Sequence, residues 1–136
     1  MNTQAEEQKA LMADLGEFRP FAYFDKHMDC IRVLIKDVSV TEDRLGKFFT
    51  VARPNHMPPP FNGQNVGFTI KGVAHLFHSV GLPFAGVHDV VDVLDKIVKC
   101  MPHSAVKQIV DEFSPVLKEQ KLTVTIAREE NEFCAA

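Results

Sequence analysis

The chain has 136 residues, of which 46% are hydrophobic and 24% charged, a length and composition typical of one globular domain. Its formal net charge is −3 and its basic residues are interleaved with acids, which argues against a nucleic-acid-binding protein. No apolar run approaches the roughly 18 residues of a membrane span, and the acidic N-terminus lacks the basic start of a targeting peptide.

Residues 3–15 are expected to form a short helix. Thr3 and Glu6 have the spacing of a capping box. The apolar positions are sparse and late, so the helix should dock by its C-terminal end only, and Gly16 should end it. These apolar positions are Leu11, Met12 and Leu15.

Residues 21–53 are expected to be strands. The aromatic run over residues 21–24 predicts the first. Residues 29–36 alternate with a period of two and are rich in β-branched side chains, which is typical of a strand. A tight turn at Gly46 would lead into another strand over residues 48–52. In residues 29–36, one face carries Ile31, Val33 and Ile35, and the other carries Cys30, Arg32, Leu34 and Lys36.

Residues 53–65 form the clearest loop. Three consecutive prolines favour extended polyproline backbone, and Asn62-Gly63 favours a turn. A loop of this length often forms a lid or a partner surface, but its prolines also stabilise a fold by restricting the unfolded chain. Both interpretations stay open. The candidate ligand or partner residues are Arg53, His56, Met57 and Phe61.

Residues 66–71 alternate again and predict another strand. Beyond them the chain is mostly helical. An apolar stripe over residues 73–80 ends at Gly81, and a second stripe over residues 90–101 follows Asp89, which is a suitable N-cap.

The last part of the chain is expected to contain one more helix and one strand. Ser104 is a suitable N-cap for the helix, and Pro115 should interrupt it, so that Ser114 caps a final short turn. Residues 122–126 alternate and should return to the sheet, while residues 128–136 should fray as a tail.

Strands grouped before helices predict an α+β fold, with an antiparallel sheet of four to five strands and helices packed on one face. We expect residues 1–136 to form a single domain. Cys30, Cys100 and Cys134 are odd in number and widely spaced, which suits neither a disulfide framework nor a zinc site. A reducing compartment, and hence a cytoplasmic location, is the simplest expectation.

The candidate metal ligands are His75, His78 and His88. The first two lie three residues apart and would share one side of a helix, and imidazole suits a transition metal. The alternative is that His75 and His78 are solvated side chains beside a core helix, because no acidic residue at helical spacing supplies a third ligand.

A second candidate is a polar cluster around the first long strand. Asp29, Arg32 and Lys36 could meet Glu42, Asp43 or Arg44. A paired acid and base can transfer protons, but the same residues suit ordinary ion pairs on a solvated sheet face.

Three functions are compatible with this sequence. We expect a non-catalytic binding or assembly module that forms a homodimer, because a sheet covered on one side leaves a second face that carries Cys30 and Leu34, and because the chain has 11 Phe. The alternatives are a small metal-dependent or acid–base enzyme that uses the histidine cluster, and a sensor of a small apolar ligand. No nucleotide, serine-hydrolase or zinc-protease motif is present, and we expect neither nucleic acid nor membrane as partner.

Overall fold

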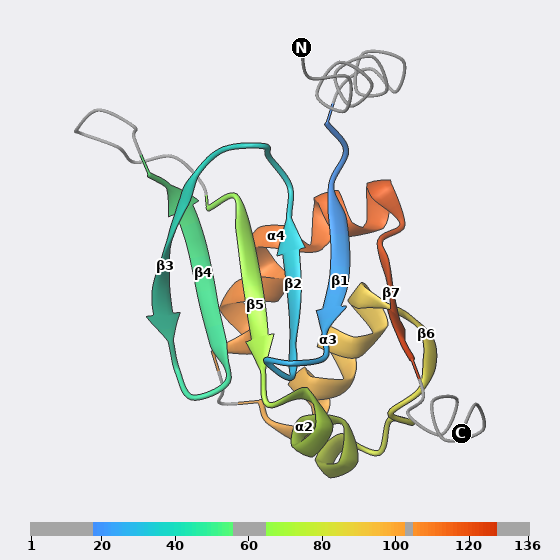
Figure 1. Cartoon of the computed structure of the whole chain (residues 1–136). Coiled ribbons are helices and arrows are strands. Elements are labelled where there is room, and N and C mark those ends of the chain that lie inside the picture. The colour runs from blue at the N-terminus through green and yellow to red at the C-terminus, as the bar shows by residue number, and fades with distance from the viewer. Residues whose placement is uncertain (1–17, 56–64, 103–104, 128–136) are drawn as a thin grey trace, which may run out of the picture.

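The computed structural model describes residues 18–55, 65–102 and 105–127. A five-stranded sheet forms the centre of the molecule, in the order β1-β2-β5-β4-β3, with every neighbouring pair antiparallel. Its strands are β1 (Phe21–Asp25), β2 (Cys30–Leu34), β3 (Val40–Leu45), β4 (Phe49–Pro54) and β5 (Gly67–Lys71). The described helices are α2 (Val73–Val80), α3 (Val90–Cys100) and α4 (Val106–Gln120). α3 and α4 lie behind one face of the sheet, and α2 lies at its lower end (Figure 1). The predicted α+β fold is therefore confirmed.

The core lies between the sheet and the helices. Because side chains alternate across a strand, β2, β4 and β5 each direct every second residue towards the helices. Fully burying a large apolar side chain contributes about 1.5–3 kcal/mol, so this layer dominates the stability of the fold. Its largest fully buried members include Ile31, Phe49, Phe68, Ile70, Phe77, Leu94, Ile97, Ile109, Phe113 and Leu117.

The starts of α2 and α3 are held by two aspartates. Asp89 caps α3 as predicted, because its Oδ1 accepts hydrogen bonds from the backbone N–H of Val91 at 2.9 Å and of Asp92 at 3.4 Å. The first residue of α2 follows Gly72, which has no side chain to cap the helix. Asp29, in the turn between β1 and β2, acts as the cap in place of a side chain at Gly72. Its Oδ1 accepts a hydrogen bond from the backbone N–H of Ala74 at 3.0 Å.

The last strand does not return to the central sheet, so that prediction was wrong. β7 (Thr123–Ile126) pairs with β6 (Gly86–Asp89) in a separate two-stranded antiparallel sheet, beside β1. Val124 and Ile126 are buried, while Thr123 and Thr125, which alternate with them, are exposed. This alternation determines which face of β7 is buried, but it does not determine which strand pairs with β7.

The predicted break at Pro115 was also wrong. α4 is continuous from Val106 to Gln120, and Ser114 caps no separate turn. Val106, Ile109, Phe113 and Leu117 form one buried stripe across the proline, and burial of this stripe outweighs the one hydrogen bond that an interior proline removes. The predicted cap, Ser104, lies outside the described residues, and α4 begins after Ala105.

None of the helices in the described part of the chain is long and apolar enough to cross a membrane. The predicted helix over residues 3–15 and the predicted tail over residues 128–136 lie outside the described residues.

Candidate functional site

The face of the central sheet that points away from α2, α3 and α4 is the candidate site, and we call it the open face. Register defines its members. Arg32 on β2 lies opposite Tyr23 on β1 and Thr69 on β5, and Thr69 lies opposite Thr50 on β4. No helix of the described residues covers it (Figure 1). Its other members include Phe21, Cys30, Leu34, Val40, Glu42, Ala52 and Gly67.

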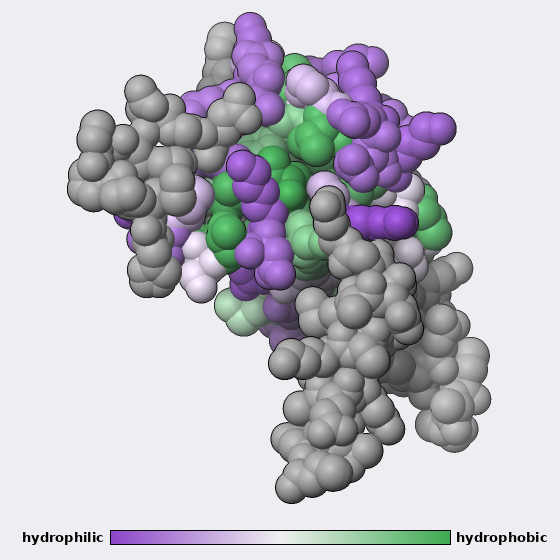
Figure 2. Space-filling view, turned by 90° about the horizontal axis from the view of Figure 1, so that it is seen from above, coloured by the Kyte–Doolittle hydropathy of each residue, from purple (hydrophilic) through white to green (hydrophobic). Residues whose placement is uncertain are grey.

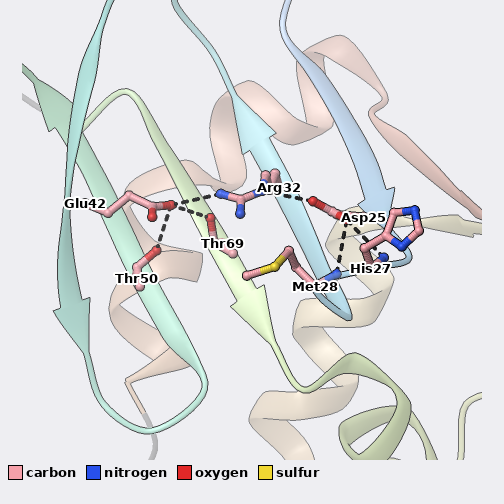
Figure 3. Close-up of polar contacts among 7 residues, drawn as sticks. All are labelled: Asp25, His27, Met28, Arg32, Glu42, Thr50 and Thr69. Carbon is pink, nitrogen blue, oxygen red and sulfur yellow. Dashed lines mark hydrogen bonds and ion pairs between the residues drawn. The ribbon is translucent and has the colours of Figure 1, made fainter.

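Glu42 is the centre of a polar cluster on the open face (Figure 3). Its Oε1 accepts from the Thr69 hydroxyl at 2.9 Å, from the Thr50 hydroxyl at 3.4 Å and from Arg32 Nη1 at 3.3 Å. The two threonines are buried, with 4% exposure each, while the Arg32 and Glu42 side chains are 33% and 41% exposed. The charged pair therefore lies over the hydroxyls and shields them from solvent.

The cluster continues from Arg32 to the turn between β1 and β2. Arg32 Nε lies 3.9 Å from Asp25 Oδ2. The other carboxylate oxygen, Oδ1, accepts from the backbone N–H of His27 and of Met28, both at 3.1 Å. Asp25 thus shapes the turn and faces Arg32 at the same time, so the charged row runs from β1 to β3 (Figure 3).

Cys30 lies opposite Asp25 in the β1–β2 register and has only 2% exposure. Burial is the main cause that raises the pKa of its thiol above the ordinary value, and Asp25, Glu42 and Asp29 raise it further while Arg32 lowers it. A nucleophilic cysteine needs a stabilised thiolate. The environment of Cys30 favours the neutral thiol instead, which suits a packed side chain.

Aromatic side chains border the open face at the start of β1. Phe21 stacks on Tyr23 with ring centroids 5.9 Å apart, and Phe18 meets Phe21 edge-on at 5.7 Å. The exposed fractions are 36% for Phe18, 40% for Phe21 and 44% for Tyr23. Figure 2, which views the molecule from above, shows hydrophobic surface between hydrophilic side chains at this end. Large apolar groups therefore stay in contact with solvent here.

A hollow of about 170 Å³ lies beside these aromatic rings, and from here on it is called the hollow. Gly67 and Ala52 lie opposite each other and leave the sheet without a large side chain at this point. A Cβ at Gly67 would clash with the backbone oxygen of Val33, so only glycine fits there. The lining is apolar on most sides and polar at one end, formed by Phe21, Tyr23, Leu34, Val40 and Ala52 with Arg32, Glu42 and Thr69.

The structure does not bring the three predicted metal ligands together. His75 is exposed and stacks against Phe48 at 6.5 Å, and His78 is also exposed on α2. The Nε2 atom of His88 lies 2.9 Å from the carbonyl oxygen of Pro83 and 3.0 Å from that of Ala85, so it donates its proton to them. Within residues 18–55, 65–102 and 105–127, no three His, Cys, Asp or Glu side chains form a group that could hold a metal ion.

Only part of the predicted polar cluster forms. Arg32 forms an ion pair with Glu42, which is one of the predicted combinations. Asp29 is used at the start of α2 instead, and Asp43 binds Arg53, with Oδ2 2.8 Å from Nε, on the opposite side of β3. Of the four predicted loop residues, the structure describes only Arg53. His56, Met57 and Phe61 lie outside the described residues.

The sequence reasoning missed Thr50, Thr69 and the hollow. Thr50 and Thr69 are polar residues between large apolar ones in their strands, and each has a small residue, Ala52 or Gly67, two positions away. That pattern is only a weak signal of a satisfied hydroxyl pair. The hollow had no signal, because it depends on which strands are neighbours. No protein-family model, curated protein or solved structure matches the chain, so a function has to be inferred from the geometry of the open face.

Proposed function

We propose that this protein is a non-catalytic binding and assembly module that forms a homodimer through the open face of its central sheet. The observation that carries the proposal is the combination of exposed aromatic rings, an apolar hollow and a balanced charge pair on one sheet face. Exposed apolar surface of this kind, bordered by polar groups, is typical of interaction sites.

The size of the hollow favours a protein partner over a free small molecule. Pockets for drug-sized ligands usually measure about 300–1,000 Å³, and the hollow measures about 170 Å³. A space of that size suits a single large side chain, which is how interfaces often anchor a partner. The partner side chain would pack against Phe21 and Val40.

The charges of the open face favour a second copy of the same chain. Arg32 and Glu42 carry opposite charges and lie side by side near the middle of the face. In a two-fold symmetric dimer the same patch meets itself, so Arg32 of one protomer can lie opposite Glu42 of the other. A partner of strongly negative or positive charge would gain little from such a balanced surface.

The area of the open face indicates that the dimer is weak. Five strands about 4.8 Å apart and about five residues long cover roughly 400 Å². A standard interface buries about 800 Å² on each partner. We therefore expect reversible association in the micromolar range rather than an obligate dimer.

Size-exclusion chromatography with light scattering tests the proposal directly. The full chain should elute with a mass that rises towards twice the monomer mass of 15.3 kDa as its concentration increases. The substitution Tyr23→Glu places a charge beside the hollow and should abolish the rise. Val87→Glu is the matched control, because Val87 is an exposed apolar residue, at 67%, on β6.

A clean monomer at high micromolar concentration would rule the homodimer out. Equal loss of dimer in both variants would show that the open face has no special role. Native mass spectrometry of the purified chain tests the remaining alternative, a small apolar ligand in the hollow. Such a ligand would appear as an added mass that Tyr23→Glu removes.

A further inference from the structure

A second cavity lies away from the open face, where the turn between β1 and β2 meets the start of α2 (Figure 1). Phe24 alternates with Tyr23 along β1, so its ring points to the other side of the sheet. The cavity measures about 210 Å³, and we call it the Phe84 cavity. Its lining is partly aromatic and partly charged, and consists of Phe24, Lys26, Asp29, Ala74, Phe84 and Ala127.

The aromatic wall of the Phe84 cavity is held in place by the core. Phe84 meets Phe24 edge-on, with ring centroids 5.5 Å apart, and meets Phe77 edge-on at 6.2 Å. Phe77 is fully buried on α2, whereas Phe84 is 40% exposed. Phe84 therefore rests on a fixed support while part of its ring faces solvent, and it offers a ligand a preformed apolar surface.

The polar end of the cavity carries one negative and one positive side chain. Asp29 is fixed there, because its Oδ1 and Oδ2 lie 3.0 and 3.4 Å from the backbone nitrogen of Ala74, which donates to them. An ionised carboxylate has about four lone-pair sites, so Asp29 can also accept from a ligand ammonium. A lysine ammonium has three N–H donors, so Lys26 can donate to a ligand carboxylate in addition to its interaction within the protein.

We propose that the Phe84 cavity binds a free apolar α-amino acid of about the size of leucine. The ammonium of the ligand faces Asp29, its carboxylate faces Lys26, and its side chain packs against the aromatic wall. The volume agrees, because water occupies about 30 Å³ per molecule in the liquid, and the cavity therefore holds roughly seven groups of that size. The inference goes beyond the proposed function, since this site needs neither the open face nor a second copy.

Titration of the full chain with L-leucine, followed by amide nuclear magnetic resonance spectra, tests the proposal. Saturable shifts should appear at Ala74, Phe84 and Ala127, with a dissociation constant of order 0.1–1 mM, and the amide of Thr69 on the open face should not shift. Leucinamide lacks the carboxylate and isocaproate lacks the ammonium, so each should bind at least tenfold more weakly. Saturation at the open face instead, or no saturable shift at all, would overturn the site, and equal binding of isocaproate would overturn the choice of an amino acid.

Two variants place the ligand in the cavity. Ala74→Leu fills the cavity from an exposed position of α2 and should abolish leucine binding. His78→Leu, one turn further along the same helix and outside the lining, is the matched control and should bind leucine as wild type does. Asp29→Asn keeps an acceptor for the helix but removes the negative charge, so it should weaken leucine binding at least tenfold. Equal loss in Ala74→Leu and His78→Leu, or full binding by Ala74→Leu and Asp29→Asn, would contradict this placement.

Discussion

Arg32 Nη1 donates to Glu42 Oε1 at 3.3 Å although β5 and β4 lie between their strands. Three strand spacings of about 4.8 Å separate β2 from β3, so both side chains lie flat across the sheet. They can do so because the positions beneath them are threonines, which bond to the same Glu42 oxygen. The pair therefore covers the middle of the open face and is also the group that a second protomer would meet.

Glu42 should matter to stability through the threonines more than through Arg32. Glu42→Ala leaves two buried hydroxyls without their acceptor, which should lower the free energy of unfolding by about 1–3 kcal/mol. Arg32→Met should cost less than about 1 kcal/mol, because partly exposed ion pairs contribute little. Urea unfolding measures both. Asp43→Ala, which removes a carboxylate from the other side of β3, is the control and should cost less than about 1 kcal/mol; a larger loss in Arg32→Met than in Glu42→Ala would contradict the account.

Asp29 should contribute as a helix cap supplied from a distant turn. Its φ of 52° is left-handed, a conformation that Asn tolerates and Ala does not. Asp29→Asn should therefore be mildest, Asp29→Gly should lose about 1 kcal/mol for the missing cap, and Asp29→Ala should lose about 1–2 kcal/mol more through backbone strain. Thermal or urea unfolding gives the ranking, and an Ala variant as stable as the Asn variant would show that the cap and the strain are both unimportant.

Cys30 should make stability fall at alkaline pH. The pKa of its thiol is raised in the folded state, mainly by burial, so the unfolded chain releases the proton first as pH rises. The stability that the buried neutral thiol contributes is complete below its pKa in the unfolded chain, about 8.5. It is lost as the pH rises towards the pKa of the thiol in the folded state. Wild type should lose stability relative to Cys30→Ala between pH 8 and pH 10 in urea titrations. A constant difference over that range would contradict the raised pKa.

Pro115 should be a destabilising residue in α4. It is exposed on a helix that continues past it, so Pro115→Ala restores a backbone hydrogen bond and removes a ring clash without loss of packing. The gain, reduced by the larger entropy of the unfolded chain, should be about 1–2 kcal/mol in urea unfolding. Gln108→Ala, at another exposed position of α4, should change stability by less than about 0.5 kcal/mol. A destabilised Pro115→Ala variant would mean that the proline has a packing role.

Local signals predicted much of the fold because they report burial directly. The alternation around Ile31 and Val33, the stripe that ends at Gly81 and the cap at Asp89 all appear in the structure. The strand over Val40–Leu45 received no separate prediction, because its charged residues hide the alternation at an edge strand. Pro115 was misjudged because a local penalty was given more weight than the burial of Leu117.

The candidate site was harder to predict because it depends on strand order. The sequence placed Arg32 and Leu34 on the face away from the core, and it offered Glu42 as one of several partners for Arg32. It could not show that β5 and β4 lie between them, and so it could not foresee the roles of Thr50 and Thr69 or the hollow over Gly67. The histidines were the clearest candidate metal ligands in the sequence. In the fold, however, the Nε2 atom of His88 is hydrogen-bonded to two backbone carbonyls and is not directed at His75 or His78.

The most direct measurement of the central claim is a dilution series followed by amide nuclear magnetic resonance spectra. Self-association through the open face predicts concentration-dependent shifts at Tyr23, Arg32 and Thr69, with the amides of α3 and α4 unchanged. Spectra that do not change between about 10 μM and 1 mM, or shifts confined to α3 and α4, would contradict it.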